Sequence, residues 1–258
     1  MILDRARRAV CNRAMTDDTK IALVTGANKG IGFEIAAGLA GLGMTVLVGA
    51  RDEGRRADAV ARLKNARGIA LDVTDQSTVD AAAAEIGDRY GRLDVLVNNA
   101  GVPGTLTPPS ACEVAEIKEV FEANLFGVVR VTNAMLPLLR RSPSARIVNV
   151  SSGTGSLTNM TDPGHYFTAM PAAAAYVSSK SALNMLTVQY AKELRADGVL
   201  VNCAIPGPCN TDFLKGLDLG IPITRTAADG AAIAVKLATL GPDGPTGGAF
   251  DDNGAYPW

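Results

Sequence analysis

Tyr176 and Lys180 are four residues apart in the stretch Ala-Tyr-Val-Ser-Ser-Lys, at residues 175–180. On a helix, residues at this spacing lie on the same face. A tyrosine with a pKa of about 10 is a weak acid at neutral pH. A lysine held nearby stabilises the phenolate and lowers that pKa by about 1–3 units, which suits a proton donor. The same pair also fits a half-buried tyrosine beside a solvated lysine, so the rest of the chain has to decide.

A glycine-rich stretch at residues 25–32, Thr-Gly-Ala-Asn-Lys-Gly-Ile-Gly, follows a short apolar run and precedes a helical pattern. Glycines permit positive φ and a close approach of the backbone to a pyrophosphate, and a helix N-terminus offers free N–H groups. The stretch therefore predicts a dinucleotide-binding loop. Its expected cofactor contacts are Gly26, Asn28, Lys29, Gly30 and Ile31.

The end of the next predicted strand indicates which dinucleotide binds. A carboxylate there binds the ribose hydroxyls of NAD and repels a 2′-phosphate. Arg51 stands in that place, and its planar guanidinium suits a phosphate, with Lys29 as a second positive charge. We therefore expect NADP(H), while Asp52, one residue later, keeps NAD open as an alternative.

The elements that position these residues follow an alternating pattern. From residue 20, short β-branched runs alternate with amphipathic helical runs. This pattern predicts an α/β fold with a doubly wound parallel sheet of about seven strands, of the Rossmann type. We expect a single domain over residues 20–258. Such sheets bind ligands at the carboxyl ends of their strands. The expected strands cover residues 21–24, 45–48, 68–71, 95–97, 146–150, 200–204 and 249–251. The expected helices cover residues 30–41, 54–64, 76–90, 114–139, 172–196 and 227–240.

Two stretches rich in glycine and proline interrupt this pattern, at residues 153–171 and 206–226. Loops of this length inside a compact domain are usually functional, so we expect both to form substrate loops. Residues 1–19 precede the first strand, carry four arginines and lack the apolar core of a secretory signal. We expect either a disordered extension or a true start at Met15.

Composition excludes several functional classes. The 258 residues are 47% hydrophobic and 20% charged, with a net charge of -1, which gives no basic surface for nucleic acid. No apolar run reaches the roughly 18–20 residues that span a bilayer. The cysteines and the sole histidine have no metal-ligand spacing, so we expect no metal site and free thiols in a reducing cytoplasm. These residues are Cys11, Cys112, Cys203, Cys209 and His165.

Together with Asn-Asn-Ala-Gly at residues 98–101, the glycine loop and the pair Tyr176 and Lys180 make residues 20–251 resemble a short-chain dehydrogenase/reductase of the compact, single-domain type. The resemblance implies hydride transfer between a nicotinamide and a carbonyl carbon, with Tyr176 as proton donor. Lys180 would lower the tyrosine pKa and bind the nicotinamide ribose. Ser152 would hydrogen-bond the substrate carbonyl, with the adjacent Ser151 as an open alternative.

The resemblance implies further site residues. Asn124 would help to hold a water on the proton-relay path. Asp72 and Val73 would lie beside the adenine ring. The remaining expected cofactor contacts are Asn99, Ala100, Gly101, Pro206, Gly207 and Thr211, the last three closing over the nicotinamide.

The chain departs from the family pattern between Ser152 and Tyr176, where it carries extra residues. Carbonyl reductases with an insertion here use it to shape the pocket, so the insertion is either part of the substrate wall or an exposed surface excursion. Tyr166 lies in it but has a methionine four residues later, which favours Tyr176 as the donor. The insertion contains Met160, His165, Tyr166, Phe167 and Met170.

We therefore expect an NADPH-dependent reductase of a ketone or aldehyde, with an oxidative NAD(P)-dependent alcohol dehydrogenase and a non-catalytic NADP-sensing protein as alternatives. The loops favour a small to medium, largely uncharged substrate, and a carrier-bound ketone stays open. Relatives pair through the helices expected at residues 114–139 and 172–196, although an insertion before the tyrosine can block this. We expect a cytoplasmic homo-oligomer, a dimer or tetramer, with no nucleic-acid or membrane partner.

Overall fold

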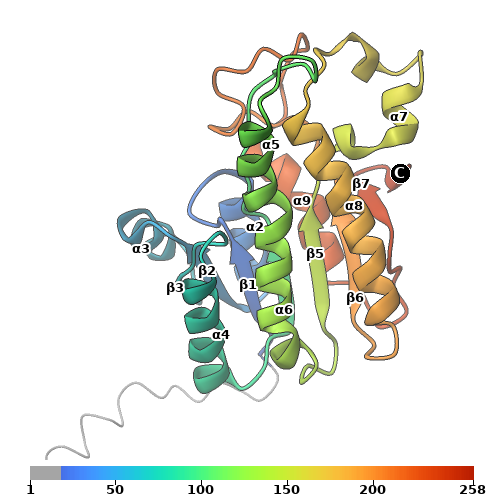
Figure 1. Ribbon diagram of the computed structural model, residues 1–258. Coiled ribbons are helices and arrows are strands. Elements are labelled where there is room, and N and C mark those ends of the chain that lie inside the picture. The colour runs from blue at the N-terminus through green and yellow to red at the C-terminus, as the bar shows by residue number, and fades with distance from the viewer. Residues whose placement is uncertain (1–18) are drawn as a thin grey trace, which may run out of the picture.

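The computed structural model describes residues 19–258 (Figure 1), so the extension expected over residues 1–19 lies outside the described residues except for Thr19. Within that range the strands form one eight-stranded sheet in the order β3-β2-β1-β4-β5-β6-β7-β8, parallel except for β8, which runs antiparallel to β7. The strands are β1 (Ile21–Thr25), β2 (Thr45–Ala50), β3 (Ala66–Ala70), β4 (Val95–Asn98), β5 (Arg146–Val150), β6 (Leu200–Ala204), β7 (Ala249–Asp251) and β8 (Gly254–Tyr256). The prediction of a doubly wound α/β sheet is confirmed.

Helices cover both faces of the sheet (Figure 1). On one face, Ile35 of α2 and Leu237 of α9 belong to one apolar core. On the other, Ile86 of α4, Met135 of α6 and Tyr190 of α8 belong to a second. The helices are α2 (Gly30–Gly41), α3 (Glu53–Ala61), α4 (Gln76–Tyr90), α5 (Val114–Phe121), α6 (Gly127–Leu139), α7 (Leu157–Thr161), α8 (Ala175–Glu193) and α9 (Ala227–Ala238). Because both faces are covered, the central strands β1, β4 and β5 are continuous runs of buried residues.

Two elements differ from the sequence-based expectation. The helix expected over residues 114–139 is interrupted by a π-helical turn, η1 (Glu122–Phe126), between α5 and α6. Its extra residue per turn carries no signature in the apolar periodicity, and such turns frequently occur at functional sites. The short strand β8 was not expected, because three residues are too few to show a period-two pattern.

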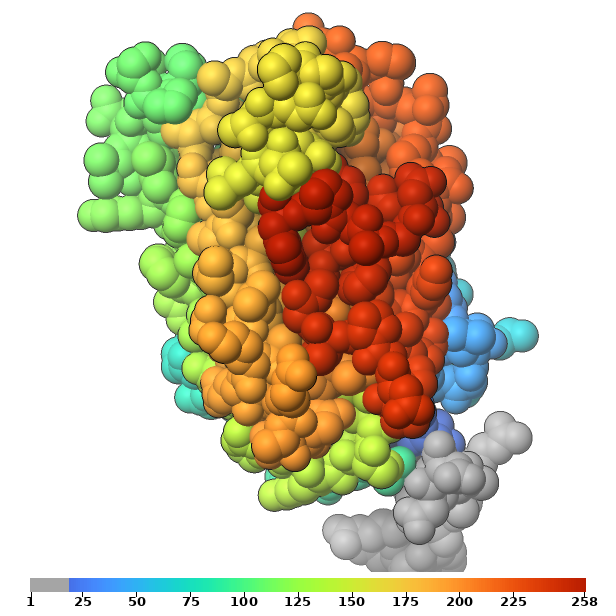
Figure 2. All heavy atoms as spheres, turned by 90° about the vertical axis from the view of Figure 1, so that its right-hand side faces the viewer, coloured from blue at the N-terminus to red at the C-terminus, as the bar shows by residue number. Residues whose placement is uncertain are grey.

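The loops that follow the parallel strands gather at one edge of the sheet, at the top of Figure 1. They include the insertion after β5, with the short helices η2 (Gly153–Gly155), α7 and η3 (Tyr166–Ala169). Figure 2 shows this insertion lying against the C-terminal segment, and the Thr158 N–H donates to the Trp258 carbonyl at 2.9 Å. The C-terminus therefore braces the insertion over the edge where ligands are expected.

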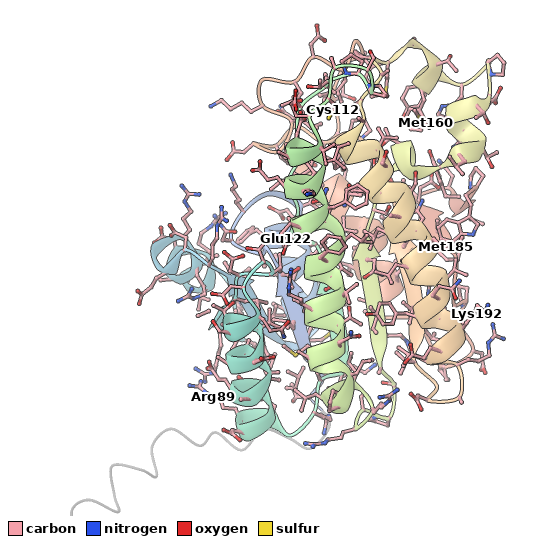
Figure 3. All side chains as sticks on the ribbon, viewed as in Figure 1. Arg89, Cys112, Glu122, Met160, Met185 and Lys192 are labelled. Atoms are coloured by element: carbon pink, nitrogen blue, oxygen red, sulfur yellow. The ribbon has the colours of Figure 1, made fainter. Side chains whose placement is uncertain are left out.

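In the part of the chain that the structure describes, no helix combines the length and the apolar character needed to cross a membrane. Cys112, Cys203 and Cys209 are free thiols. Val114 on α5 and Met185 on α8 expose large apolar side chains on the helices of the expected pairing. Met185 is labelled in Figure 3. Pairing of two copies through these helices stays a prediction.

Candidate active site

A cleft of about 950 Å³ opens at the carboxyl edge of the sheet. The glycine loop, the ends of β2, β4 and β5, the first turns of α8 and the loop after β6 all contribute to its wall. One continuous space therefore joins the predicted dinucleotide loop to the predicted proton donor. Every predicted site residue except Asn124 lines this cleft.

The glycine loop has the geometry of a phosphate cradle. Gly26 and Gly30 have φ of 63° and 56°, in the left-handed region that favours glycine. Lys29 caps α2 without a side-chain hydrogen bond, so the cap leaves the first N–H groups of the helix for a ligand. A Cβ at Gly32 would lie 2.3 Å from Asn99 Nδ2, which makes glycine obligatory there. These residues fit a dinucleotide pyrophosphate.

Thr25 holds the glycine loop against the end of β4, and the sequence analysis did not single it out. Its hydroxyl accepts hydrogen bonds from the N–H groups of Asn99 and Ala100, both at 3.0 Å. Asn99 Nδ2 donates back to the Thr25 carbonyl at 2.9 Å. A threonine in an otherwise apolar, fully buried strand was the available signal, because a buried hydroxyl needs a partner.

The residues at the end of β2 divide into cations that face the cleft and a carboxylate that caps a helix. Arg51 is 78% exposed, and its Nη1 lies 3.8 Å from Asp72 Oδ2. Asp52 Oδ1 accepts from the Arg55 N–H at 2.8 Å as the N-cap of α3. Arg55 adds a second cation to the cleft wall. Arginines on a surface helix are common, so no pattern in the sequence distinguishes Arg55.

The structure brings Ser152, Tyr176 and Lys180 together. The Ser152 hydroxyl, just after β5, shares a hydrogen bond with Thr154 Oγ1 at 3.0 Å, and the Tyr176 phenol, on the first turn of α8, lies beside it. The Ser151 hydroxyl donates instead to Asn184 Oδ1 at 2.6 Å. Of the two serines left open by the sequence, Ser152 therefore has its hydroxyl beside the phenol.

Burial controls the protonation of this group. Lys180 is 5% exposed, and its Nζ donates to the Val150 carbonyl at 2.9 Å and lies 5.6 Å from the centre of the Tyr176 ring. Burial lowers the pKa of Lys180 to about 8. Burial also raises the pKa of Tyr176 to about 12, with the Ser152 hydrogen bond acting in the opposite direction. The expected lowering of the tyrosine pKa by Lys180 is therefore not seen, because desolvation outweighs the effect of a lysine at this distance.

Asn124 lies in the π-helical turn η1 and is 1% exposed. Its Oδ1 accepts from the Val102 N–H at 2.8 Å, and its Nδ2 donates to the Val102 carbonyl at 3.0 Å and to Ser179 Oγ at 3.1 Å. The side chain thus joins the strand β4 loop to α8. The expected part of Asn124 in holding a water stays a prediction.

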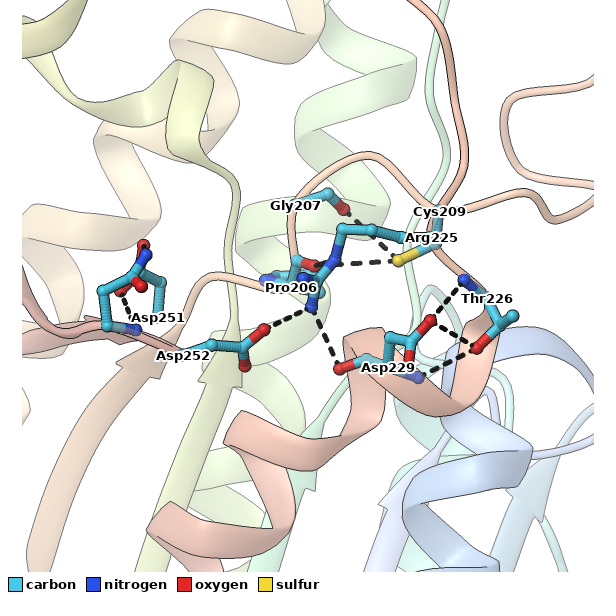
Figure 4. A network of polar contacts seen from close by, with 9 residues as sticks. Pro206, Gly207, Cys209, Arg225, Thr226, Asp229, Asp251 and Asp252 are labelled. Atoms are coloured by element: carbon cyan, nitrogen blue, oxygen red, sulfur yellow. Dashed lines mark hydrogen bonds and ion pairs between the residues drawn. The ribbon is translucent and has the colours of Figure 1, made fainter.

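The loop after β6 is tied at its base (Figure 4). Arg225 Nε donates to the Pro206 carbonyl at 3.0 Å, and its Nη2 pairs with Asp252 Oδ2 at 2.6 Å. The Cys209 thiol contacts the Gly207 carbonyl at 3.5 Å. These contacts fix Pro206 and Gly207 at the wall of the cleft.

The far part of the same loop reaches over the cleft. Lys29 Nζ forms an exposed ion pair with Asp212 Oδ2 at 2.9 Å, and a Cβ at Gly30 would lie 3.7 Å from Thr211 Cγ2. The Phe213 ring meets the Tyr176 ring edge-on, with centroids 5.8 Å apart. The loop therefore covers both the glycine loop and the predicted proton donor.

The insertion contributes to the opposite wall, as one of the two interpretations expected. Four of its five named side chains line the cleft: Met160, Tyr166, Phe167 and Met170. Figure 3 labels Met160 on the insertion. The fifth, His165, stacks on Tyr166 with ring centroids 4.6 Å apart and is not part of the lining. Tyr256 of β8 also lines the cleft, and a Cβ at Gly153 would lie 2.6 Å from its hydroxyl. The sequence analysis missed Tyr256 because it missed β8.

Comparison with known proteins gives a consistent family. The family model described as short chain dehydrogenase matches residues 20–220. A short-chain dehydrogenase of Penicillium roqueforti is 37% identical over 86% of this chain and 89% of its own. Salutaridine reductase of Papaver bracteatum is 33% identical over 90% of this chain and 94% of its own. The crystal structure of an NADPH-bound carbonyl reductase from chicken fatty liver has a TM-score of 0.81 at 28% identity, covering 93% of this chain and 99% of that one.

Proposed function

Because the chain belongs to the short-chain dehydrogenase family, we propose that it reduces a ketone or aldehyde with NADPH. Members of this family are oxidoreductases that bind a nicotinamide cofactor and act on carbonyl or alcohol groups. The observation that carries the proposal is the placement of the Ser152 hydroxyl beside the Tyr176 phenol, with Lys180 Nζ 5.6 Å from the centre of the Tyr176 ring. Both groups line the cleft that also contains the glycine loop. A carbonyl oxygen that meets both hydroxyls receives two hydrogen bonds where negative charge develops.

When bound, NADPH supplies the hydride to the carbonyl carbon. Tyr176 then gives its proton to the alkoxide oxygen, and Ser152 donates a hydrogen bond to that oxygen. An alcohol is about as weak an acid as water and a weaker acid than a phenol. The transfer from Tyr176 is therefore downhill even with its pKa raised to about 12. Protonated Lys180 stabilises the phenolate that remains.

The charges at the end of β2 support NADPH over NADH. Arg51 and Arg55 line the cleft, and Arg51 is 78% exposed and thus free to rotate toward a phosphate. Asp52 would be the ribose-binding carboxylate of an NAD enzyme, but one of its oxygens caps α3 through the Arg55 N–H. The NADPH-bound carbonyl reductase of similar fold agrees with this preference.

The wall around Ser152 and Tyr176 indicates the substrate class. It is largely apolar and includes the aromatic side chains of Tyr166, Phe167, Phe213 and Tyr256. Two of the charged groups in the lining have partners of opposite sign: Asp212 pairs with Lys29, and Arg225 pairs with Asp252. A small to medium, uncharged carbonyl compound fits this wall. Further apolar lining residues are Val102, Leu106, Met160, Met170, Leu214, Leu217, Leu219 and Ile221.

The test is a panel of ketones and aldehydes, followed by the loss of NADPH absorbance, with wild type and two tyrosine variants. Tyr176→Phe should lower kcat by about 10²–10⁴-fold, the usual contribution of a general acid, and should keep NADPH binding. Tyr166→Phe is the matched control, because it removes a phenol from the same cleft without the contact to Ser152. Full activity of Tyr176→Phe would show that another group donates the proton.

A further inference from the structure

Helix α8 carries three polar side chains on one stripe, Tyr176, Lys180 and Asn184, at successive spacings of four residues. The proposed function uses the first two. Asn184 is 6% exposed and has no part in that chemistry. Its hydrogen bonds indicate what it does instead.

Asn184 spans both ends of the turn that contains Ser152. Its Oδ1 accepts from Ser151 Oγ at 2.6 Å, at the beginning of the turn. Its Nδ2 donates to the Gly155 carbonyl at 3.1 Å, at the end of the turn. Within the turn, Ser152 Oγ accepts from the Thr154 N–H at 3.3 Å. Ser152 therefore lies between two residues, Ser151 and Gly155, that both hydrogen-bond the side-chain amide of Asn184.

The turn also packs directly on the helix backbone. A Cβ at Gly155 would lie 2.9 Å from the Lys180 carbonyl carbon and 3.0 Å from Asn184 Nδ2. Lys180 Nζ donates to the carbonyl of Val150, the residue before the turn. The stretch from Val150 to Gly155 is therefore attached to α8 at three levels, and α8 carries Tyr176.

Only an asparagine-like side chain satisfies this position. Its oxygen accepts from Ser151 and from the Cys203 thiol at 3.5 Å, while its nitrogen donates to Gly155. A carboxylate would place a negative oxygen against the Gly155 carbonyl. A leucine would remove both hydrogen bonds of the amide and leave only Ser181 Oγ, at 3.1 Å, to hold the Gly155 carbonyl. In residues 19–258, no buried side-chain nitrogen or oxygen lacks a hydrogen-bond partner, so this amide belongs to a fully satisfied network.

We propose that Asn184 is a positioning residue, which fixes the Ser152 hydroxyl relative to the Tyr176 phenol by fastening the turn at residues 151–155 to α8. The proposal rests on the proposed function for its kinetic consequence. A displacement of about 1 Å in a catalytic group lowers the rate by up to about 10²-fold. Asn184 itself touches neither substrate nor cofactor in this assignment.

The kinetic test compares Asn184→Ala with Thr187→Val. Thr187 lies one turn further along α8, is fully buried and accepts from Asn149 Nδ2 at 2.8 Å, but it does not touch the turn. Asn184→Ala should lower kcat by about 10–100-fold, with the Kd of NADPH within about threefold of wild type. Thr187→Val should lower thermal stability to a similar degree and keep kcat within about threefold. Equal losses of kcat in both variants would overturn the proposal.

A double-mutant cycle tests whether Asn184 acts through Ser152. In a Ser152→Ala background, Asn184→Ala should lower kcat by less than about threefold, because the group that it positions is already gone. A merely structural role would multiply the two effects, and that result would refute the inference. Ser151→Ala, which removes one attachment and keeps Asn184, should give a smaller effect in the same direction and serves if Asn184→Ala does not fold.

Hydrogen exchange separates this inference from the proposed function. Asn184→Ala should raise the exchange rate of a peptide covering residues 151–157 by about tenfold or more, and Thr187→Val should not. Unchanged exchange would overturn the inference even in an active reductase. Raised exchange in a protein without NADPH-dependent reductase activity would support the positioning role and refute the proposed function.

Discussion

Replacing Lys180 by methionine should stabilise the protein near neutral pH. Burial lowers the pKa of Lys180 from its ordinary value of 10.5 to about 8. At about 1.4 kcal/mol per pH unit, this gap corresponds to a cost of about 3 kcal/mol for holding the cation in the folded protein. Methionine keeps most of the apolar stem and removes the charge. It also removes the hydrogen bond to the Val150 carbonyl, whose loss costs about 1–2 kcal/mol.

The sign of the effect depends on pH. Below about pH 8, Lys180 is protonated in both the folded and the unfolded protein, and the full cost is present. Between about 8 and 10.5, the unfolded protein binds more protons, so the wild-type contribution to stability rises with pH. We expect Lys180→Met to be more stable than wild type by about 1–2 kcal/mol at pH 7 and less stable above pH 9–10 or so, where the lost hydrogen bond dominates.

The measurement is the free energy of unfolding in urea for wild type and variant at closely spaced pH values from about 6 to 10. Taking the difference removes the contributions of titratable groups that do not interact with Lys180. The buried Cys203 does interact with it, because the lysine charge lowers the pKa of this thiol. Lys192→Met, on the exposed face of the same helix (Figure 3), controls for removal of a lysine as such. A difference between wild type and Lys180→Met that stays constant from pH 7 to 10 would refute a depressed lysine pKa.

Two further predictions concern catalysis and cofactor choice. The kcat for reduction should be constant below about pH 8 and should fall above it, because Lys180 then loses the proton that stabilises the phenolate of Tyr176. A kcat that rises through pH 8 would contradict this. Arg51→Ala should weaken NADPH binding by about 10–30-fold, as expected for one exposed charge against a phosphate, and leave NADH binding unchanged. Arg67→Ala, an exposed arginine on β3, is the control in the same equilibrium titrations, and equal effects on NADPH and NADH would show that Arg51 does not read the phosphate.

The sequence predicted the features that depend on local pattern. Apolar runs such as residues 146–150 become buried strands because both faces of the sheet are covered, and the glycine loop follows from its spacing alone. The π-helical turn at Asn124 was beyond reach, because one extra residue inside a long apolar helix hardly alters its periodicity. The strand containing Tyr256 was missed because two of its three residues, Gly254 and Ala255, are of types that are depleted in strands.

The electrostatics of the site were harder to predict than its residues. The spacing of Tyr176 and Lys180 correctly placed them on one helix, but it could not show that Lys180 donates to Val150 or how deeply Lys180 is buried. Desolvation is a property of everything packed around a group, so it depends on contacts between distant segments. Similarly, Ser151 and Ser152 are equivalent in sequence, and only the position of Asn184 distinguishes them.

The buried lysine links the stability of α8 to its chemistry. A lysine that stayed in water would keep its charge at no cost, but it would stabilise a phenolate only weakly through the high dielectric of the solvent. Burial strengthens that interaction and lowers the pKa of Lys180 to about 8, still high enough for the lysine to remain charged at neutral pH. In the proposed mechanism, the energy lost in burying the charge is recovered when a negative charge forms on Tyr176, which favours the transition state over the resting enzyme. This is why the same substitution, Lys180→Met, should raise stability and abolish turnover together.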